Sequence, residues 1–173
     1  MRPFLIWLDR LITYLRYAIS GVVVLLFCVM MIAVLVQVCG RYVFNYSISA
    51  ATEISTFSQI WLVLLGAGVA MARNQHVAID LLPASLPLPL QRVAKLAIAA
   101  ITLAFLAVLA YGSLPLLQMG TFQTSSAMQL PMWVVYLCLP AGAFYVALEL
   151  IVSTIKTWDA PFAAAADAEE EAV

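Results

Sequence analysis

The sequence predicts an all-α integral membrane protein with four transmembrane helices, and three observations support this fold class. Hydrophobic residues make up 65% of the chain and charged residues only 10%, which lies outside the usual composition of soluble domains. The mean hydropathy is +1.05. Four apolar stretches, at residues 18–39, 54–72, 96–117 and 132–155, come close to the ~20 residues that a helix needs to cross a bilayer.

The distribution of basic residues predicts that both termini are cytoplasmic. Seven basic residues lie before the first span, between the second and third spans, or after the fourth span. These are Arg2, Arg10, Arg16, Arg73, Arg92, Lys95 and Lys156. Only Arg41 lies in the first connection. Because basic connections stay on the cytoplasmic side, we expect a multi-pass protein of the bacterial inner membrane.

The chain is expected to have three parts. Residues 1–16 predict an amphipathic helix with its arginines on one side, lying along the cytoplasmic interface. Residues 17–156 predict the four-helix membrane domain, and residues 157–173 an acidic, alanine-rich tail that we expect to be disordered. The first apolar run is too long for the core of a cleaved signal peptide, so we expect it to remain as an anchor.

The first connection is bordered by polar residues. Gln37 and Arg41 lie one helical turn apart at the end of the first span, and Asn45 and Glu53 precede the second. Burying a guanidinium and a carboxylate separately is costly, so we expect Arg41 and Glu53 to pair and stabilise this hairpin. Two alternatives stay open: Arg41 reaching the interface alone, and Glu53 favouring the N-terminus of the second helix.

A stripe of polar and small residues follows one side of the second span. It contains Gln59 and Gly66, together with Ser55, Ala70 and Arg73, at spacings that share one helix face. Small residues allow helices to approach closely, and side-chain amides form hydrogen bonds between them. We therefore expect this stripe to contact protein.

The connection after the second span contains Arg73, His76 and Asp80. A haem or metal site would require a second suitable ligand near His76, the only histidine in the chain. We interpret His76 as a hydrogen-bonded turn residue and Asp80 as a cap of the segment that follows. Residues 81–90, interrupted by prolines, are expected to lie in the interface.

The third span carries alanines at steps of three and four residues, which predicts a seam for close helix packing. The seam consists of Ala97, Ala100, Ala104 and Ala107.

The fourth span combines two prolines with a polar stripe. Pro131 suits its first turn, and Pro140 is expected to kink it or to remove one of its hydrogen bonds. Gly142 and Glu149 fall on one side of this helix. Because a single acid makes a poor proton pathway, we expect Glu149 to pack against protein.

No catalytic residue, metal ligand or cofactor is expected in this chain, so it is not expected to be an enzyme. Cys28, Cys39 and Cys138 show no paired spacing and are interpreted as small core residues. The expected partners are membrane lipid and other proteins, with no nucleic acid.

Several separated motifs resemble one protein family. They are Gln37 to Asn45 with Glu53-Ile54-Ser55, the connection Arg73 to Asp80, and Leu130-Pro131-Met132-Trp133 with Tyr136 and Leu139-Pro140-Ala141-Gly142. This order is similar to that of the small membrane subunit, of the DctQ type, of tripartite ATP-independent periplasmic (TRAP) transporters. Two positions depart from the family pattern: Thr52, where a second acid is common, and Gln129, where glycine is usual.

The resemblance implies secondary uptake of an organic acid, such as a C4-dicarboxylate, sialic acid or a related carboxylate, driven by a sodium gradient. A periplasmic binding protein would deliver the substrate, and a large membrane subunit, expected as a separate chain, would hold the substrate and the sodium ions. The chain resembling the small subunit would act as a scaffold for the large one. No substrate-binding residue is expected here.

Two other functions are considered. A stand-alone four-helix exporter acting as a homodimer would resemble proteins with a glutamate inside the first helix, where this chain has only Gln37 near the end. A membrane cytochrome subunit would call for intramembrane histidines. A membrane assembly factor stays open on the residues alone.

Overall fold

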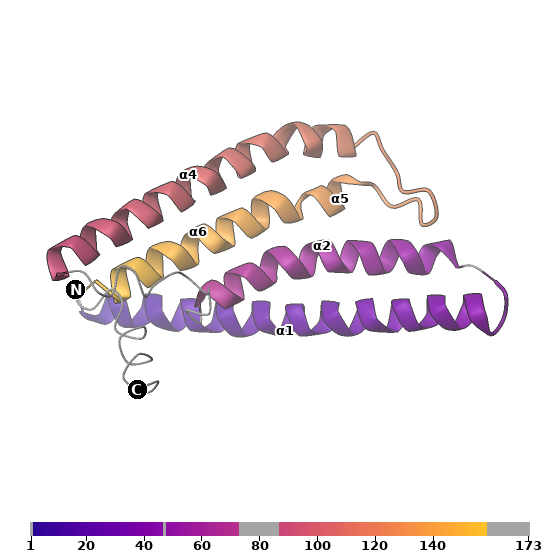
Figure 1. Ribbon diagram of the computed structural model, residues 1–173, viewed down its shortest axis with the longest axis horizontal. Helices are drawn as coiled ribbons and strands as arrows, with labels where there is room; N and C mark the ends of the chain where they lie inside the picture. The colour runs from indigo at the N-terminus through magenta and orange to yellow at the C-terminus, as the bar shows by residue number, and fades with distance from the viewer. Residues whose placement is uncertain (1, 47, 73–86, 159–173) are drawn as a thin grey trace.

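The computed structural model describes residues 2–46, 48–72 and 87–158, which are helical apart from short connections (Figure 1). The helices are α1 (Arg2–Tyr42), α2 (Ser49–Ala72), α4 (Leu88–Gly120), α5 (Trp133–Tyr136) and α6 (Cys138–Lys156). Four segments are long and apolar enough to cross a membrane: Ile12–Tyr42, Ser49–Ala72, Leu88–Gly120 and Trp133–Lys156. The predicted all-α fold with four apolar spans is confirmed for this part of the chain.

The first helix is longer than the sequence predicts. α1 runs without a break from Arg2 to Tyr42, so residues 2–16 are its first turns and not a separate helix. Neither glycine nor proline occurs at residues 16–18 to end a helix there. An interfacial position for these first turns stays a prediction.

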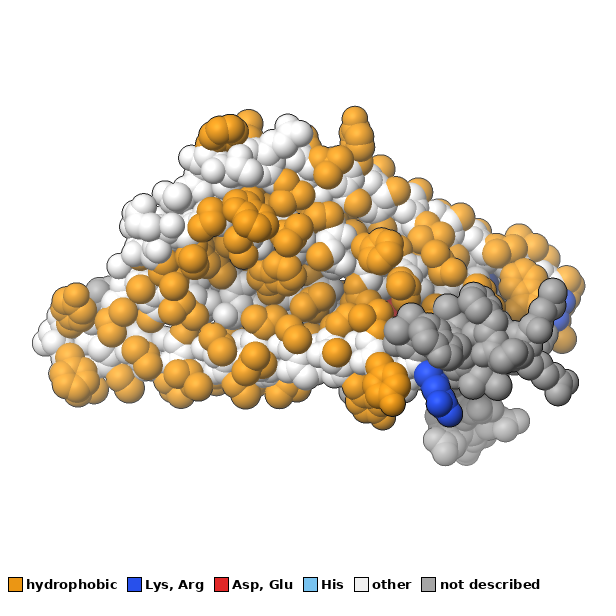
Figure 2. Space-filling view, turned by 180° about the vertical axis from the view of Figure 1, so that it is seen from behind, with side chains coloured by type: hydrophobic (Ala, Val, Ile, Leu, Met, Phe, Trp, Pro, Cys, Tyr) orange, Lys and Arg blue, Asp and Glu red, His pale blue; other side chains and the backbone are white. Residues whose placement is uncertain are grey.

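The helices form a row in the order α1, α2, α6, α4 (Figure 1). Each contacts its neighbour in the row, and α5 continues the line of α6 and lies against the C-terminal part of α4. Among the described residues, α1 has no close backbone contact with α4 or α6. The row leaves large apolar surfaces exposed (Figure 2), as expected for helices that lipid or another membrane protein covers.

The contact between α1 and α2 is an antiparallel seam. The shielded residues of α1 alternate at three and four positions, which is the spacing of a coiled-coil contact. They are Val23, Leu26, Met30, Ala33, Gln37 and Gly40. Gln37, expected to be a polar contact residue, therefore belongs to the contact with α2.

The seam predicted on the third span is not used for packing within this chain. Ala97, Ala100, Ala104 and Ala107 are all exposed. The side of α4 that faces α6 is offset from them and carries the shielded residues Ala99, Leu103, Leu106, Ala110, Ser113, Leu117 and Gly120. Both registers have the same spacing, so periodicity alone could not choose between them.

Glycines bring α2 and α6 together. A Cβ atom on Gly142 would lie 2.7 Å from Cβ of Leu64, and a Cβ atom on Gly68 would overlap the ring of Tyr145. Gly142 is buried between the two helices. Its predicted packing role is thus confirmed, and the contact is with α2 of the same chain.

The cysteines are only partly the core residues that the sequence predicts. Cys138 is buried at the start of α6, whereas Cys28 and Cys39 are exposed on α1. The two exposed cysteines lie beside the seam residues of α1 and not among them, so they face outward from the row.

The fourth span is interrupted near Pro140. α5 ends at Tyr136, and α6 starts at Cys138 after a single residue, Leu137. Since proline has no N–H group, Pro140 cannot donate a hydrogen bond to the carbonyl of Tyr136. One helical hydrogen bond is therefore missing here, while Leu137 keeps a helical backbone with φ −58° and ψ −24°. Pro131 precedes α5 and forms an isolated antiparallel bridge with Thr124.

Three predicted polar residues, Arg73, His76 and Asp80, lie outside the described residues. The same holds for the proline-rich segment up to residue 86 and for residues 159–173 of the tail.

Candidate functional site

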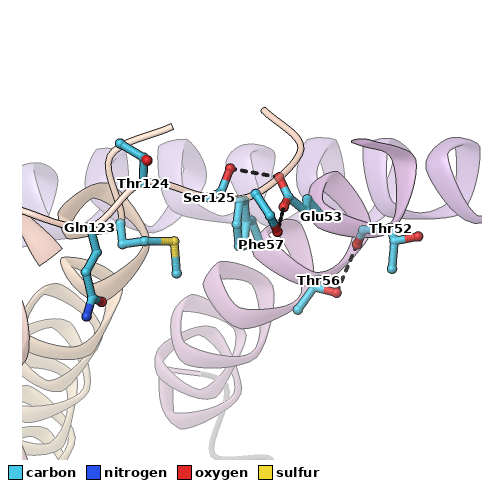
Figure 3. A pocket seen from close by; sticks show the side chains of 9 residues that line it. Thr52, Glu53, Thr56, Phe57, Gln123, Thr124 and Ser125 are labelled. Atoms are coloured by element: carbon cyan, nitrogen blue, oxygen red, sulfur yellow. Dashed lines mark hydrogen bonds between the residues drawn. The ribbon is translucent and has the colours of Figure 1, made fainter. Parts of the chain in front are cut away.

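Glu53 fastens the connection between α4 and α5 to the start of α2. Its carboxylate accepts hydrogen bonds from the hydroxyls of Ser125 (2.8 Å) and Ser126 (3.1 Å) and from the backbone N–H groups of Ala127 (2.8 Å) and Met128 (3.0 Å). Figure 3 shows Glu53 and Ser125 facing each other. An ionised carboxylate has about four acceptor positions, so this loop uses its whole capacity.

The loop itself is a small hairpin with one strained residue. The N–H of Ser125 donates to the carbonyl of Leu130 (2.9 Å), and the N–H of Met132 donates to the carbonyl of Gln123 (2.9 Å). Gln129 has a φ of 53°, in the left-handed region that favours glycine. The glycine that the family resemblance leads us to expect at this position would therefore suit the turn better.

The predicted pair between Arg41 and Glu53 is not formed among the described residues. Arg41 is exposed in the last turn of α1, where a positive charge is favourable beside the helix C-terminus. The first hairpin is closed by the backbone, because the N–H of Tyr46 donates to the carbonyl of Gly40 (2.9 Å). Asn45 has a φ of 48°, a conformation that asparagine tolerates, which gives this residue a structural role.

A cavity of about 450 Å³ lies between the start of α2 and this hairpin (Figure 3). Thr52, Thr56, Gln123 and Thr124 give it hydroxyl and amide groups, and Phe57 gives it an apolar side. Its carboxylate, Glu53, is occupied by the loop. The cavity offers neutral hydrogen-bonding groups, and no group of three His, Cys, Asp or Glu residues in the described part of the chain could hold a metal ion.

At the opposite ends of the helices, where α1 begins and α6 ends, Arg16 and Glu149 form an ion pair between α1 and α6. Nε of Arg16 donates to both carboxylate oxygens (3.0 and 3.1 Å), and Nη2 donates to Oε2 (2.6 Å). Glu149 is fully buried, and the side chain of Arg16 is 29% exposed. Because α1 and α6 have no close backbone contact among the described residues, this pair links two helices that are not direct neighbours in the row.

Further contacts join α4 and α6 at this same end. The ammonium group of Lys95 donates to Thr157. The guanidinium of Arg92 lies 5.9 Å from the ring centre of Trp158, within the range of a cation–π interaction. The polar groups at this end therefore stabilise the chain's own helix contacts.

Two predicted contact residues on α2 point away from the chain. Gln59, near the middle of α2, is exposed, and a Cβ atom on Gly66 would meet nothing within 4 Å. The two positions are seven residues apart and so share a helix face. Their side of α2 is open for another molecule.

Sequence reasoning missed the partners of both Glu53 and Glu149. Arg16 was expected on the polar side of an interfacial helix, and the loop residues that bind Glu53 were not singled out. A signal for Arg16 existed: the predicted topology places it at the same membrane face as Glu149, the only acid within the fourth span. Nothing in the sequence pointed to the loop, whose binding groups are partly backbone amides.

These features define the class of protein. Four apolar helices form an open row. The polar side chains near the two ends of these helices mainly hold helices and a loop of the same chain, so this is a multi-pass membrane protein built as one layer of helices. The chain belongs to the family "Tripartite ATP-independent periplasmic transporters, DctQ component", whose model matches residues 30–160. It is therefore a DctQ-type small subunit of a TRAP transporter.

Three relatives illustrate this membership. The chain is 38% identical over 74 residues to a TRAP transporter small permease protein of Haemophilus influenzae, covering 43% of this chain and 46% of the relative. It is 37% identical over 73 residues to the C4-dicarboxylate TRAP transporter small permease protein DctQ of Vibrio cholerae, covering 42% and 32%. It is 27% identical over 149 residues to the isethionate TRAP transporter permease protein DctMQ of Oleidesulfovibrio alaskensis, covering 84% and 23%. The matches span less than half the length of each relative.

Proposed function

We propose that this chain braces the large membrane subunit of a TRAP transporter, which takes up an organic acid delivered by a periplasmic binding protein and uses a sodium gradient. The substrate and sodium sites belong to the large subunit. The match to a DctMQ protein supports this arrangement. The name of this relative combines the small component, DctQ, with a second TRAP component in one permease protein. The transporter lies in the bacterial inner membrane, with both termini of this chain in the cytoplasm.

The orientation is supported by the positions of charged residues in the fold. Five basic residues lie toward the side of the helix layer at which α1 begins and α6 ends. They are Arg10, Arg16, Arg92, Lys95 and Lys156. Arg41 lies on the opposite side, where α1 ends (Figure 1). Because basic residues stay on the cytoplasmic side, this asymmetry favours a cytoplasmic position for the side at which α1 begins.

The proposed role as a brace is supported mainly by the open side of α2, which carries Gln59 and Gly66. An amide exposed to lipid lacks the hydrogen bonds that water would give it, and this is unfavourable. A helix of the large subunit placed there would satisfy the amide of Gln59 and approach closely at Gly66. The polar contacts within the chain, by contrast, fix its own helices, which suits a frame that stays still while its neighbour moves.

Co-purification of a tagged chain with its large subunit tests this role. Gly66→Ala fills the open position and is expected to weaken the complex by about 5- to 150-fold, the equivalent of ~1–3 kcal/mol of overpacking. Gly112→Ala is the matched control, because a Cβ atom on Gly112 also meets nothing within 4 Å but lies on α4. Equal complex yields for the two variants would contradict the proposed contact surface.

A further inference from the structure

The open side of α2 has two chemically different halves. In the half nearer the start of the helix, Thr52, Thr56 and Gln59 are exposed and carry hydroxyl and amide groups. In the half nearer its end, Val63 is 57% exposed, and the position of a Cβ atom on Gly66 is open space. These five residues follow one another at steps of four and three positions, so they form one line along the helix.

The amide of Gln59 has no partner within the described part of the chain. Its side chain is exposed and forms no hydrogen bond with the residues that the structure describes. It lies near the middle of a 24-residue helix that is apolar enough to cross a membrane, which places the amide at the depth of the hydrocarbon. Because lipid tails cannot form hydrogen bonds, the partner that satisfies this amide is a polar group of a protein.

The cavity of about 450 Å³ shares Thr52 and Thr56 with the polar half of this line (Figure 3). Gln123 and Thr124 of the hairpin face them across the cavity. The hydroxyl of Thr56 donates to the carbonyl of Thr52 (2.9 Å), which leaves its oxygen able to accept a further hydrogen bond. Four hydrogen bonds to Glu53 hold the hairpin in place, so this chain forms the cavity by itself.

We propose that one transmembrane helix of the large subunit lies along this whole line. It presents uncharged hydrogen-bonding side chains opposite the polar half, and bulky apolar side chains that pack over Gly66. One of its polar side chains enters the cavity, whose available groups are neutral hydroxyls and amides. This inference rests on the proposed function, which supplies the partner, and it adds the chemistry that the partner helix must present.

The large subunit is the partner that family membership provides. DctQ components work with a large TRAP membrane subunit. A second copy of this chain fits the line less well, because identical residues meet at a two-fold axis. Gln59 would then face Gln59, and Gly66 would face another glycine and not a larger side chain.

Site-specific photocrosslinking in the assembled complex tests the position of the partner helix. p-Benzoylphenylalanine is placed, one position at a time, at Thr52, at Val63 and at Ala70, which continues the line four residues beyond Gly66. The control position is Ile101, which is 71% exposed on α4. We expect the large subunit to be crosslinked from all three positions on α2 and much less from the control.

Two substitutions test the hydrogen bonds. Gln59→Leu keeps the size of the side chain but removes its amide, and Thr56→Val removes a hydroxyl with little change of shape. Each is expected to weaken the complex by about two- to tenfold, the effect of one hydrogen bond. Affinity is measured in detergent by titrating the fluorescently labelled chain with the large subunit. Both side chains are exposed, so the isolated variants should unfold at the same denaturant concentration as the unchanged protein.

Two residues of α4 provide matched controls for these substitutions. Gln118→Leu removes an exposed amide. Thr102→Val removes a hydroxyl that donates to the carbonyl four residues earlier, as that of Thr56 does. Neither control is expected to change the affinity for the large subunit.

The outcomes separate this inference from the proposed function. Failure of the unchanged chain to form any complex with the large subunit would overturn both. A complex that is crosslinked from only one end of the line, or that keeps full affinity in either variant, would overturn the inference and leave the proposed function standing. Crosslinked pairs at twice the chain mass of 18.8 kDa would assign the line to a second copy of this chain and would also overturn the inference.

Discussion

The ion pair between Arg16 and Glu149 gives the sharpest test of how the row is held together. Glu149 is fully buried and receives hydrogen bonds of 3.0, 3.1 and 2.6 Å from Arg16. Arg16→Ala leaves this carboxylate buried without its partner, which typically costs ~3–5 kcal/mol. Since whole proteins are stable by only ~5–15 kcal/mol, we expect a large loss of stability.

A double substitution separates the pair from its surroundings. Replacing both residues by apolar ones, as Arg16→Met with Glu149→Leu, removes the need to compensate a charge and is expected to restore most of the stability, because such replacements are often neutral or stabilising by ~1–4 kcal/mol. The free energy of unfolding is measured in detergent by denaturant titration followed by tryptophan fluorescence. The matched control is Arg10→Ala, since Arg10 is exposed on the same helix and should change stability by less than ~0.5 kcal/mol.

The reasoning would be refuted by either of two results. One is a cost for Arg16→Ala no larger than that of Arg10→Ala. The other is additivity, in which the double variant loses as much stability as the single variants Arg16→Met and Glu149→Leu lose together, because residues in direct contact are expected to be coupled.

Three further predictions concern packing and the loop. Gly142→Ala places a Cβ atom 2.7 Å from Cβ of Leu64 and should cost ~1–3 kcal/mol in the same unfolding assay, with the open Gly112→Ala as its control. Gln129→Gly relieves a φ of 53° and should stabilise by up to ~1 kcal/mol, so a loss would contradict the turn conformation. Glu53→Gln keeps the shape but removes the charge that binds two loop amides, so these amides should exchange hydrogen faster; unchanged exchange would exclude the anchoring role.

The spans could be predicted because their signals are local. Hydropathy and length identify each of the four apolar helices, and Pro140 marks where the fourth span lacks one hydrogen bond, between α5 and α6. The row order could not be predicted in this way. It depends on which face of each helix meets the next, and on α4 the exposed alanines and the true contact residues have the same periodicity.

The polar contacts were harder to predict for a different reason. Arg41 and Glu53 are near in sequence and of opposite charge. Glu53 instead binds a hairpin whose first contacting residue, Ser125, lies 72 residues away, and whose donors include backbone amides. Glu149 likewise finds its partner 133 residues away. Topology narrows such choices, because partners must lie at the same membrane face, and for Glu149 it leaves the seven basic residues of the predicted cytoplasmic side, Arg16 among them.

Transport in proteoliposomes tests most directly whether this chain is a brace for another protein and not a carrier in its own right. The chain alone, the large subunit with the binding protein, and all three together are reconstituted, and the sodium-driven uptake of labelled organic acids is measured. We predict uptake only with all three components. Uptake by the chain alone, or equal uptake by the large subunit and binding protein without it, would contradict the account.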